Sequence, residues 1–332
     1  MVSDKPFLSI SQQIEQLRDD RGLLFNSEER AHDILVRYGY YEVINGYKEH
    51  FMKNVDDDSK GFIEGITFEH VFALYDFDRH LREITMNSIE LFEANLRQVV
   101  AYTVAENISF DQSIFMDRKH YRTGNKYWNQ KLHKNVYPVD TLMSTMTNIS
   151  KSKVDPYKHY REEHGNIPPW IIVKKLSFGN LIWWYQLLPA ACSDIIIARM
   201  FGFPVAFVKN IPDLRSVFSS LLKLYLNYRN TAAHGGRIYN HKSEKYALPY
   251  FQIFQKDILG ISEADYRHGK GQSRFGFMMR SIGFMGNHDP GRELYQAAMN
   301  QLKEYLKRYP DDKNYLLETM ELTEDPIIKT RI

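Results

Sequence analysis

The sequence contains a single cysteine, Cys192, among 332 residues. One cysteine cannot form an internal disulfide or a cysteine-based zinc site, so both kinds of scaffold are excluded. Long hydrophobic runs are also lacking: the longest, 181–192, is interrupted by Gln186 and is shorter than the roughly 20 residues that cross a membrane. The first residues lack the basic start and apolar middle of a signal peptide. These absences predict a cytoplasmic protein without membrane association.

Neither sign of charge is in excess. The chain has 43 Lys and Arg against 41 Asp and Glu, so its formal net charge of +2 neither requires nor excludes a polyanionic partner. Any surface for nucleic acid must therefore come from local clustering. Aromatic residues make up 14% of the chain, whereas Gly and Pro number only 18 and 12, which predicts a packed globular protein rather than a disordered one.

Several common catalytic signatures are absent. The chain has no Walker A pattern, no dinucleotide-binding fingerprint, no Gly-x-Ser-x-Gly elbow and no His-Glu-x-x-His pair. His159 and His164 are five residues apart, a spacing that turns the second imidazole away from the first on a helix, so we interpret this segment as a solvated charged face. We expect no cofactor and no metal site.

Helical periodicity runs through most of the chain. Between residues 67 and 107 there is no Pro or Gly, and apolar residues recur every three or four positions, which predicts one long helix or two nearly continuous ones. Ser9 or Ser11, and later Ser27, are suited to cap two short N-terminal helices. Helical patterns return over 139–151, 177–201, 211–231 and 291–309. Because alternating strand patterns are nearly absent, we predict an all-α fold, a helical bundle.

We divide the chain into three segments. Residues 1–60 form an N-terminal helical unit, 61–240 a helical core, and 241–332 a C-terminal helical extension. The turn-rich stretch 54–65 predicts a surface loop after the first segment. Within the third, residues 269–291 are rich in Gly, Arg and Met and predict less regular structure.

A polar cluster at the end of an apolar helix is the most informative feature. Arg229, Asn230 and His234 follow a helical pattern that is apolar at Val217, Leu221, Leu224 and Tyr228. Arg229 and His234 are five residues apart, which places them about 140° out of phase on a straight helix. Either the helix stops between them, as Gly235 and Gly236 favour, or another element or a second copy of the chain completes the site.

These side chains suit cleavage of an RNA phosphodiester. An imidazole exchanges protons near neutral pH, and a guanidinium binds two phosphate oxygens at once. With the 2′-hydroxyl as nucleophile, His234 would move a proton, Arg229 would offset the charge on phosphorus, and Asn230 would orient either group, without a metal. In the alternative interpretation, the segment is a helix cap in which Arg229 binds a buried carboxylate and His234 binds the last carbonyls.

The same segment resembles a known family. Arg229-Asn230-x-x-Ala233-His234-x-x-Arg237-x-Tyr239-Asn240 is similar to a signature of the Abi_2 family, the abortive-infection proteins of AbiD and AbiF type. Other blocks resemble the family in the same order over roughly residues 5–240: Lys5-Pro6, residues 40–47, residues 75–82 with Glu93, Leu96 and Arg97, Pro169-Trp170, and residues 175–181.

The resemblance implies a HEPN-type helical RNase whose Arg-x4–6-His motif cuts RNA without metal, commonly across a dimer. It thus implies that Arg229, Asn230 and His234 are catalytic, and we predict RNA contacts from the rest of the signature, Arg237, Tyr239 and Asn240. It also implies a phage-defence toxin restrained by a small noncoding RNA. Many relatives carry a second His after the motif, where this chain has Gly235, so catalysis here could be weaker or lost. The alternative functions are a non-catalytic RNA-binding scaffold of the same defence system and, third, a protein-interaction role.

A second candidate RNA surface lies between residues 118 and 134. This stretch combines aromatic residues with basic ones and contains no acidic residue. Such a mixture is typical of phosphate contacts combined with base stacking. We predict RNA contacts from Lys119, Arg122, Lys126 and Lys131. In the alternative interpretation, the stretch is a solvated loop whose Tyr and Trp side chains pack inward.

Overall fold

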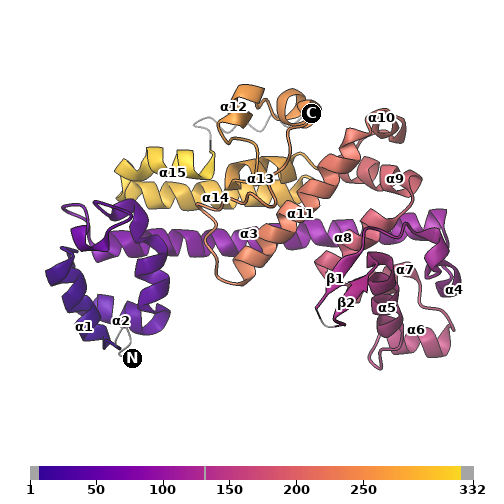
Figure 1. Ribbon diagram of the computed structural model, residues 1–332, viewed down its shortest axis with the longest axis horizontal. Helices are drawn as coiled ribbons and strands as arrows, with labels where there is room; N and C mark the ends of the chain where they lie inside the picture. The colour runs from indigo at the N-terminus through magenta and orange to yellow at the C-terminus, as the bar shows by residue number, and fades with distance from the viewer. Residues whose placement is uncertain (1–6, 131, 323–332) are drawn as a thin grey trace.

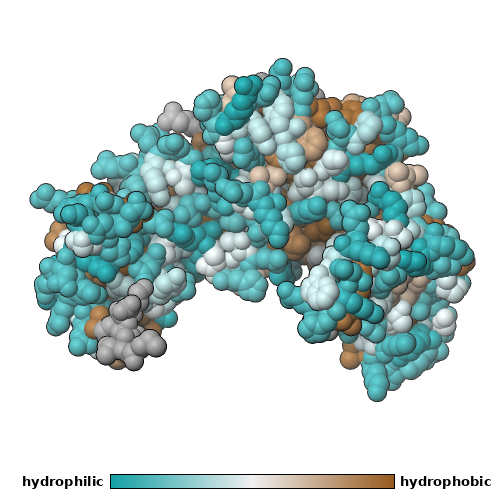
Figure 2. Space-filling view, in the orientation of Figure 1, coloured by the Kyte–Doolittle hydropathy of each residue, from teal (hydrophilic) through white to brown (hydrophobic). Residues whose placement is uncertain are grey.

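The computed structural model describes residues 7–130 and 132–322. Its described part is all-α apart from one two-stranded antiparallel sheet, as the periodicity predicts. The molecule is an elongated arch in which one long helix, α3, connects a lobe at each end (Figure 1). Figure 2 shows a deep recess between these two lobes on one side of the molecule.

The long helix α3 (Phe68–Asn107) confirms the prediction of an uninterrupted helix after residue 67. It begins where the Thr67 side chain accepts a hydrogen bond from the backbone N–H of His70. At 1.5 Å per residue its 40 residues span about 60 Å, which is why it reaches both lobes. Buried apolar side chains hold both halves of the helix, and between Leu81 and Ile89 its buried residues are Thr85 and Ser88.

The N-terminal lobe is built from short helices. Ser9 caps α1 (Ile10–Glu15) in a capping box with Gln12, and the Ser27 side chain accepts from the backbone N–H of Arg30 at the start of α2 (Glu28–Tyr38). Both predicted helices are confirmed, with Ser9 rather than Ser11 as the first cap. Single-turn π and 3₁₀ segments complete the lobe: η1 (Gln16–Asp20), η2 (Tyr41–Asn45), η3 (Lys48–Phe51) and η4 (Asp58–Lys60).

The opposite lobe contains the one sheet, which the sequence did not predict. Strands β1 (Tyr127–Asn129) and β2 (Lys134–Val136) form a hairpin in which Trp128 pairs with Asn135. The chain at this end of α3 also forms α4 (Gln112–Phe115), η5 (Arg118–His120), α5 (Pro138–Ser150), α6 (Tyr157–Glu163), α7 (Pro169–Ile172), η6 (Val173–Lys175), α8 (Phe178–Leu187), α9 (Ala190–Phe201) and α10 (Val205–Lys209). Pro189, the N-cap of α9, divides the predicted helix 177–201 in two.

The remaining helices are α11 (Asp213–Ala233), η7 (Gln252–Ile258), α12 (Glu263–Arg267), α13 (Phe275–Gly283), α14 (Asp289–Arg308), η8 (Pro310–Asp312) and α15 (Lys313–Met320). Of these, α11 and α14 pack directly on α3. The expectation of irregular structure over 269–291 is wrong at α13, whose Phe275, Phe277, Met278 and Met279 are buried. α14 packs along α3 (Figure 1). Buried residues of all three predicted segments belong to one hydrophobic core.

A buried carboxylate joins the N-terminal lobe to the C-terminal helices. Asp312 is 5% exposed and accepts hydrogen bonds from His50 Nε2 at 3.0 Å, from His70 Nε2 at 2.8 Å and from the Tyr305 hydroxyl. Burial alone would raise the pKa of Asp312, but the three hydrogen bonds outweigh burial and hold that pKa below its usual range. The ionised carboxylate therefore stabilises the folded state.

We expect Asp312→Asn to lower the free energy of unfolding by about 2 kcal/mol at pH 7, because a buried hydrogen-bonded charge is lost. A folded-state pKa below the unfolded value of about 3.9 gives stability that is present above that pH and is lost as the pH falls. The difference between wild type and variant should therefore shrink between pH 5 and about pH 3 in urea unfolding curves. Asp311→Asn, at an exposed neighbour, is the control. An equal loss of unfolding free energy at pH 5 and at pH 3 would contradict the assignment of Asp312 as an ionised carboxylate in the folded protein.

Candidate active site and RNA interface

Helix α11 carries the predicted motif at its C-terminal end. The helix follows Pro212, and all four apolar residues that predicted its inner face are fully buried. It ends at Ala233, with His234 as the C-cap and Gly235 in the left-handed region at φ +74°. The backbone N–H groups of Gly235 and Gly236 bind the carbonyls of Ala232 and Thr231 at 3.3 and 2.8 Å. The glycine pair thus closes the helix in a Schellman arrangement.

Arg229, Asn230 and His234 are all reachable from solvent. Asn230 and His234 are exposed and Arg229 is half-buried. Arg229 Nη1 lies 3.4 Å from Asn230 Oδ1, and within the described residues Arg229 forms no ion pair. Backbone groups, rather than the His234 side chain, satisfy the last carbonyls. The helix-cap interpretation is therefore wrong in its details: Arg229 binds no buried carboxylate of the described chain, and the imidazole does not cap the helix.

α11 includes every residue from 229 to 233, so the helix does not stop between Arg229 and His234. The two side chains consequently leave the helix in different directions, about 140° apart. One of the two alternatives offered by the spacing is thereby removed. What stays open is completion of the site by another element or by a second copy of the chain.

The rest of the signature turns inward. Arg237 Nη1 donates to the carbonyl of Gly46 at 2.7 Å and lies 3.3 Å from a Glu49 carboxylate oxygen. Tyr239 is 0% exposed, and its ring stacks on Tyr47 with 5.9 Å between centroids. We therefore correct the prediction that Tyr239 contacts RNA, because no base can reach its ring. Asn240 is half-buried, and its contact with RNA stays a prediction, as does that of the half-exposed Arg237.

Asp78 of α3 belongs to this site, although the sequence did not single it out. The carboxylate is 0% exposed and faces four donors. It accepts hydrogen bonds from the Tyr47 hydroxyl (2.6 Å), Arg82 Nη1 (2.9 Å) and the backbone N–H groups of Ile238 (2.9 Å) and Tyr239 (2.7 Å). The last two donors come directly after the motif. The sequence did carry a signal for it: Asp78 is an acidic residue on the apolar, inward-packing face of the predicted helix, where a carboxylate needs buried donors.

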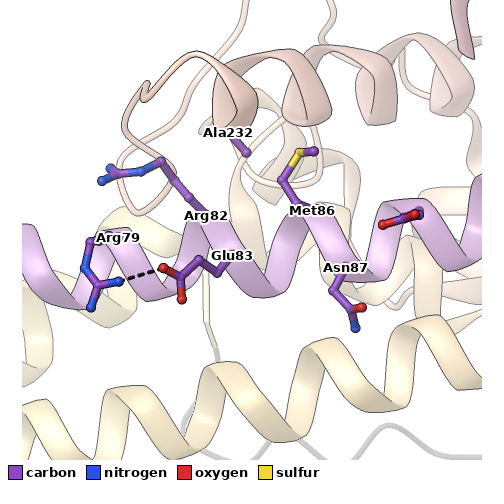
Figure 3. Close-up of a pocket in the computed structure, with 7 residues that line it drawn as sticks. Arg79, Arg82, Glu83, Met86, Asn87 and Ala232 are labelled. Carbon is purple, nitrogen blue, oxygen red and sulfur yellow. Dashed lines mark hydrogen bonds and ion pairs between the residues drawn. The ribbon is translucent and has the colours of Figure 1, made fainter. Parts of the chain in front are cut away.

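A hollow of about 450 Å³ lies between α3 and the end of α11. Its walls are Arg79, Arg82, Glu83, Met86, Asn87 and Glu90 of α3 and Ala232 of α11 (Figure 3). Arg79 binds Glu83 at 2.6 Å, and Arg82 binds Asp78 at 2.9 Å, so both guanidinium charges are already paired. The hollow thus offers hydrogen-bonding groups beside the motif without a free positive charge, which suits a polar uncharged group such as a nucleobase better than a phosphate.

The basic stretch 118–134 contains the hairpin. Tyr127 packs inward on Trp183 of α8, with 5.3 Å between ring centroids, whereas Trp128 on the opposite face of β1 is 57% exposed. The inward-packing alternative therefore holds for Tyr127 and fails for Trp128.

The basic side chains of this stretch differ in their surroundings. Lys119 is exposed and pairs with Asp117 at 2.8 Å, Arg122 donates to the carbonyl of Gln186 at 2.6 Å, and Lys126 Nζ lies 4.9 Å from the centre of the Tyr137 ring. Lys131 lies outside the described residues. Lys119, on the surface with only one exposed ion pair, is the freest of the three to meet a phosphate.

Two properties of the described residues bear on the site. No group of three or more His, Cys, Asp or Glu in that part of the chain could hold a metal ion. None of its helices is long and apolar enough to span a bilayer.

Comparison with known proteins identifies the family. The model of the Abi_2 family, described as Abi-like protein, matches residues 33–240. This range contains the blocks on α3 and α8 and the complete signature at the end of α11. Lys5-Pro6, quoted for the resemblance, precedes the match and lies outside the described residues. No curated protein and no solved structure was found to match. With more than half of its length matched, the chain belongs to the Abi_2 family of Abi-like, abortive-infection proteins.

Proposed function

We propose that this abortive-infection protein is a metal-independent endoribonuclease of HEPN type and a toxin in phage defence, with Arg229, Asn230 and His234 at its active site. One observation carries the proposal. At the end of a rigid, buried helix, a guanidinium and an imidazole are open to solvent and bind no carboxylate of the described chain. Such groups are free to bind and transform an external anion.

The reaction needs only the groups of the protein and the RNA itself. The 2′-oxygen attacks phosphorus, the bond from phosphorus to the 5′-oxygen breaks, and the products are a 2′,3′-cyclic phosphate and a 5′-hydroxyl. His234 moves a proton, from the 2′-hydroxyl or to the departing 5′-oxygen. Arg229 binds the non-bridging oxygens, whose charge increases in the transition state, and Asn230 orients Arg229, which it already approaches at 3.4 Å.

A homodimer completes this proposed site. On a single α11, Arg229 and His234 point about 140° apart, too far to meet one phosphate from the same face. Ala233 between them is small and exposed, so the backbone of a second copy can approach closely there, whereas Ala232 is buried against α3 of its own chain. Two copies related by a two-fold axis would place Arg229 of each chain near His234 of the other.

The shape of the molecule supports RNA as the substrate. In Figure 1 the end of α11 lies toward the recess between the lobes, and the hairpin of β1 and β2 stands at the edge of the same recess. Figure 2 shows that the recess is open. A strand of RNA lying there would meet the motif, the hollow on α3 and the exposed Trp128, on which a base can stack.

The test is incubation of the purified protein with single-stranded RNA in EDTA. We expect products that end in a 2′,3′-cyclic phosphate, and none from the matched strand in which the cleaved nucleotide carries a 2′-deoxyribose. Products with a 3′-hydroxyl and a 5′-phosphate, or cleavage that requires magnesium, would contradict the mechanism.

Removing two lysines of the hairpin lobe should weaken RNA binding through charge alone. For Lys119→Ala with Lys126→Ala, we expect the slope of log affinity against log salt concentration to become shallower by about 1.4, because each phosphate contact on a single strand contributes about 0.7. The control is Lys303→Ala with Lys307→Ala, two exposed lysines of α14. An unchanged slope in the first double variant, or an equal change in both, would remove this lobe from the RNA surface.

A non-catalytic scaffold for a partner RNA is the second candidate function. It is favoured by Gly235, which stands where many relatives have a second His, and by the divergence of Arg229 and His234 on one helix. In that case the protein would bind single-stranded RNA tightly and leave it intact in the EDTA assay. A small noncoding RNA that restrains the enzyme would instead slow the cleavage of added RNA.

A further inference from the structure

Asp78 lies where the long helix α3 meets the segment that follows the motif. Its carboxylate is enclosed in the core and faces donors only: one hydroxyl, one guanidinium and two backbone N–H groups. A buried carboxylate is tolerated only where such donors satisfy it. Ile238 and Tyr239 lie outside any helix or strand, so no regular backbone pattern supplies an acceptor for their N–H groups. The carboxylate therefore acts as the anchor for this stretch of backbone.

Only three residues separate His234 from Ile238, and two of them are Gly235 and Gly236. Glycine has the greatest backbone freedom of any residue, so contacts at both ends of a turn of two glycines restrict its shape more than they would for other residues. One end is held by the last turn of α11, through the hydrogen bonds to Thr231 and Ala232. The other end is held by Asp78.

We infer that Asp78 is a positioning residue for the motif: by binding the backbone of Ile238 and Tyr239, it fixes the glycine turn and with it the place of His234. The inference rests on the proposed function and deepens it. The N-terminal lobe supports the same anchor, because Tyr47 both donates to Asp78 and stacks on Tyr239. Arg237, bound to the Gly46 carbonyl, adds a second tether.

The variant Asp78→Asn tests the anchor with little change of shape. The amide replaces one carboxylate oxygen by an NH₂ group, which meets donors and can no longer accept their hydrogen bonds. In the cleavage assay we expect kcat to fall about 100-fold, as for a catalytic group displaced by about 1 Å, and KM to change by less than about threefold. Unchanged kcat would overturn the inference.

Asp194→Asn is the matched control. Asp194 is also a buried aspartate paired with an arginine, since its two oxygens bind Arg215 Nε and Nη2 at 2.7 and 2.8 Å. Arg215 lies on α11 itself, 14 residues before Arg229 and thus about 21 Å away along the helix. We expect this variant to lower the unfolding temperature without lowering kcat. An equal loss of kcat in both variants would show that Asp78 acts through stability alone, and would overturn the inference.

Two measurements separate this inference from the proposed function, because neither requires cleavage. In hydrogen exchange on the wild-type protein, the Ile238 and Tyr239 amides should be protected; free exchange there would by itself overturn the inference. In Asp78→Asn these amides should exchange at least about 100-fold faster, and the NMR signals of the His234 ring should shift, neither of which should happen in Asp194→Asn. A wild-type protein that does not cut RNA but meets these expectations would refute the RNase and retain Asp78 as the residue that places His234.

Discussion

His234→Ala is expected to slow RNA cleavage at saturating RNA by about 1000-fold, while RNA affinity changes by less than about threefold. The imidazole is exposed and has no hydrogen-bond partner in the described chain, so its loss leaves no buried group unsatisfied and creates no cavity. The effect should therefore lie in the chemical step and not in the fold. Quantification of cyclic-phosphate product in EDTA, together with a thermal unfolding curve, measures both.

Arg229→Ala should lower the same rate by about 100-fold or more, and Arg229→Lys should restore little of it, because an ammonium cannot bind two phosphate oxygens in the planar geometry of a guanidinium. Lys223→Ala is the matched control on the same helix, since Lys223 is exposed and lies about three turns before His234. Normal rates in both Arg229→Ala and His234→Ala would refute the proposed active site.

A mixture of the two inactive variants tests whether the site is shared between chains. If Arg229 of one copy acts with His234 of the other, each mixed dimer of Arg229→Ala and His234→Ala contains one intact site, and an equimolar mixture should regain about a quarter of the wild-type activity. If both residues act within one chain, mixing restores nothing. The divergence of the two side chains on α11 leads us to expect restoration.

The parts of the fold that followed from the sequence are those that depend on local patterns. α3 and α11 carry apolar residues at helical spacing over many turns, and the serines before α1 and α2 act within three residues of their own position, so periodicity and capping were sufficient. The end of α11 close to the glycine pair followed in the same way, although the helix continues to Ala233 instead of stopping between Arg229 and His234.

The missed features depend on contacts between residues far apart in the sequence. Strands β1 and β2 have three residues each, too few to show a period of two. Tyr127 of β1 packs on Trp183 of helix α8, which is distant in the sequence. Asp78 and Tyr239 were assigned no structural role because these two partners lie 161 residues apart in the chain. Tyr239, a residue of the signature, was therefore predicted to contact RNA, whereas its backbone N–H donates to the buried carboxylate of Asp78.

Glycines misled the prediction for residues 269–291 for a related reason. Glycine disfavours an isolated helix, so the segment looked irregular. In the structure, Gly276 of α13 lies so close to Glu321 that a Cβ atom would be 2.0 Å from its carbonyl oxygen. Gly291 of α14 meets α13 in the same manner. These glycines lower local helix propensity and in return allow two helix backbones to touch.

Gly291→Ala is therefore expected to lower the free energy of unfolding by about 3 kcal/mol, although alanine is the better helix former by about 1 kcal/mol. A Cβ atom at this position would lie 2.3 Å from Gly283 Cα and 2.7 Å from Gly283 N, and both are backbone atoms that cannot rotate away. The added methyl group must push α14 from α13, next to the point where Pro290 accepts a hydrogen bond from Ser88 of α3. Urea unfolding followed by circular dichroism measures the loss.

Gly179→Ala in α8 is the matched control, because it makes the same chemical change inside a helix but has room for it. There the nearest atom to a Cβ would be Leu226 Cδ2 at 3.8 Å, an ordinary contact, and the expected change is between zero and a gain of about 1 kcal/mol. Opposite signs for the two substitutions would show that close backbone packing of α13 on α14, rather than glycine's intrinsic propensity, decides stability at Gly291. A stable Gly291→Ala protein would mean that the two helices can separate at little cost, and the C-terminal helices would then not be rigid supports for α3.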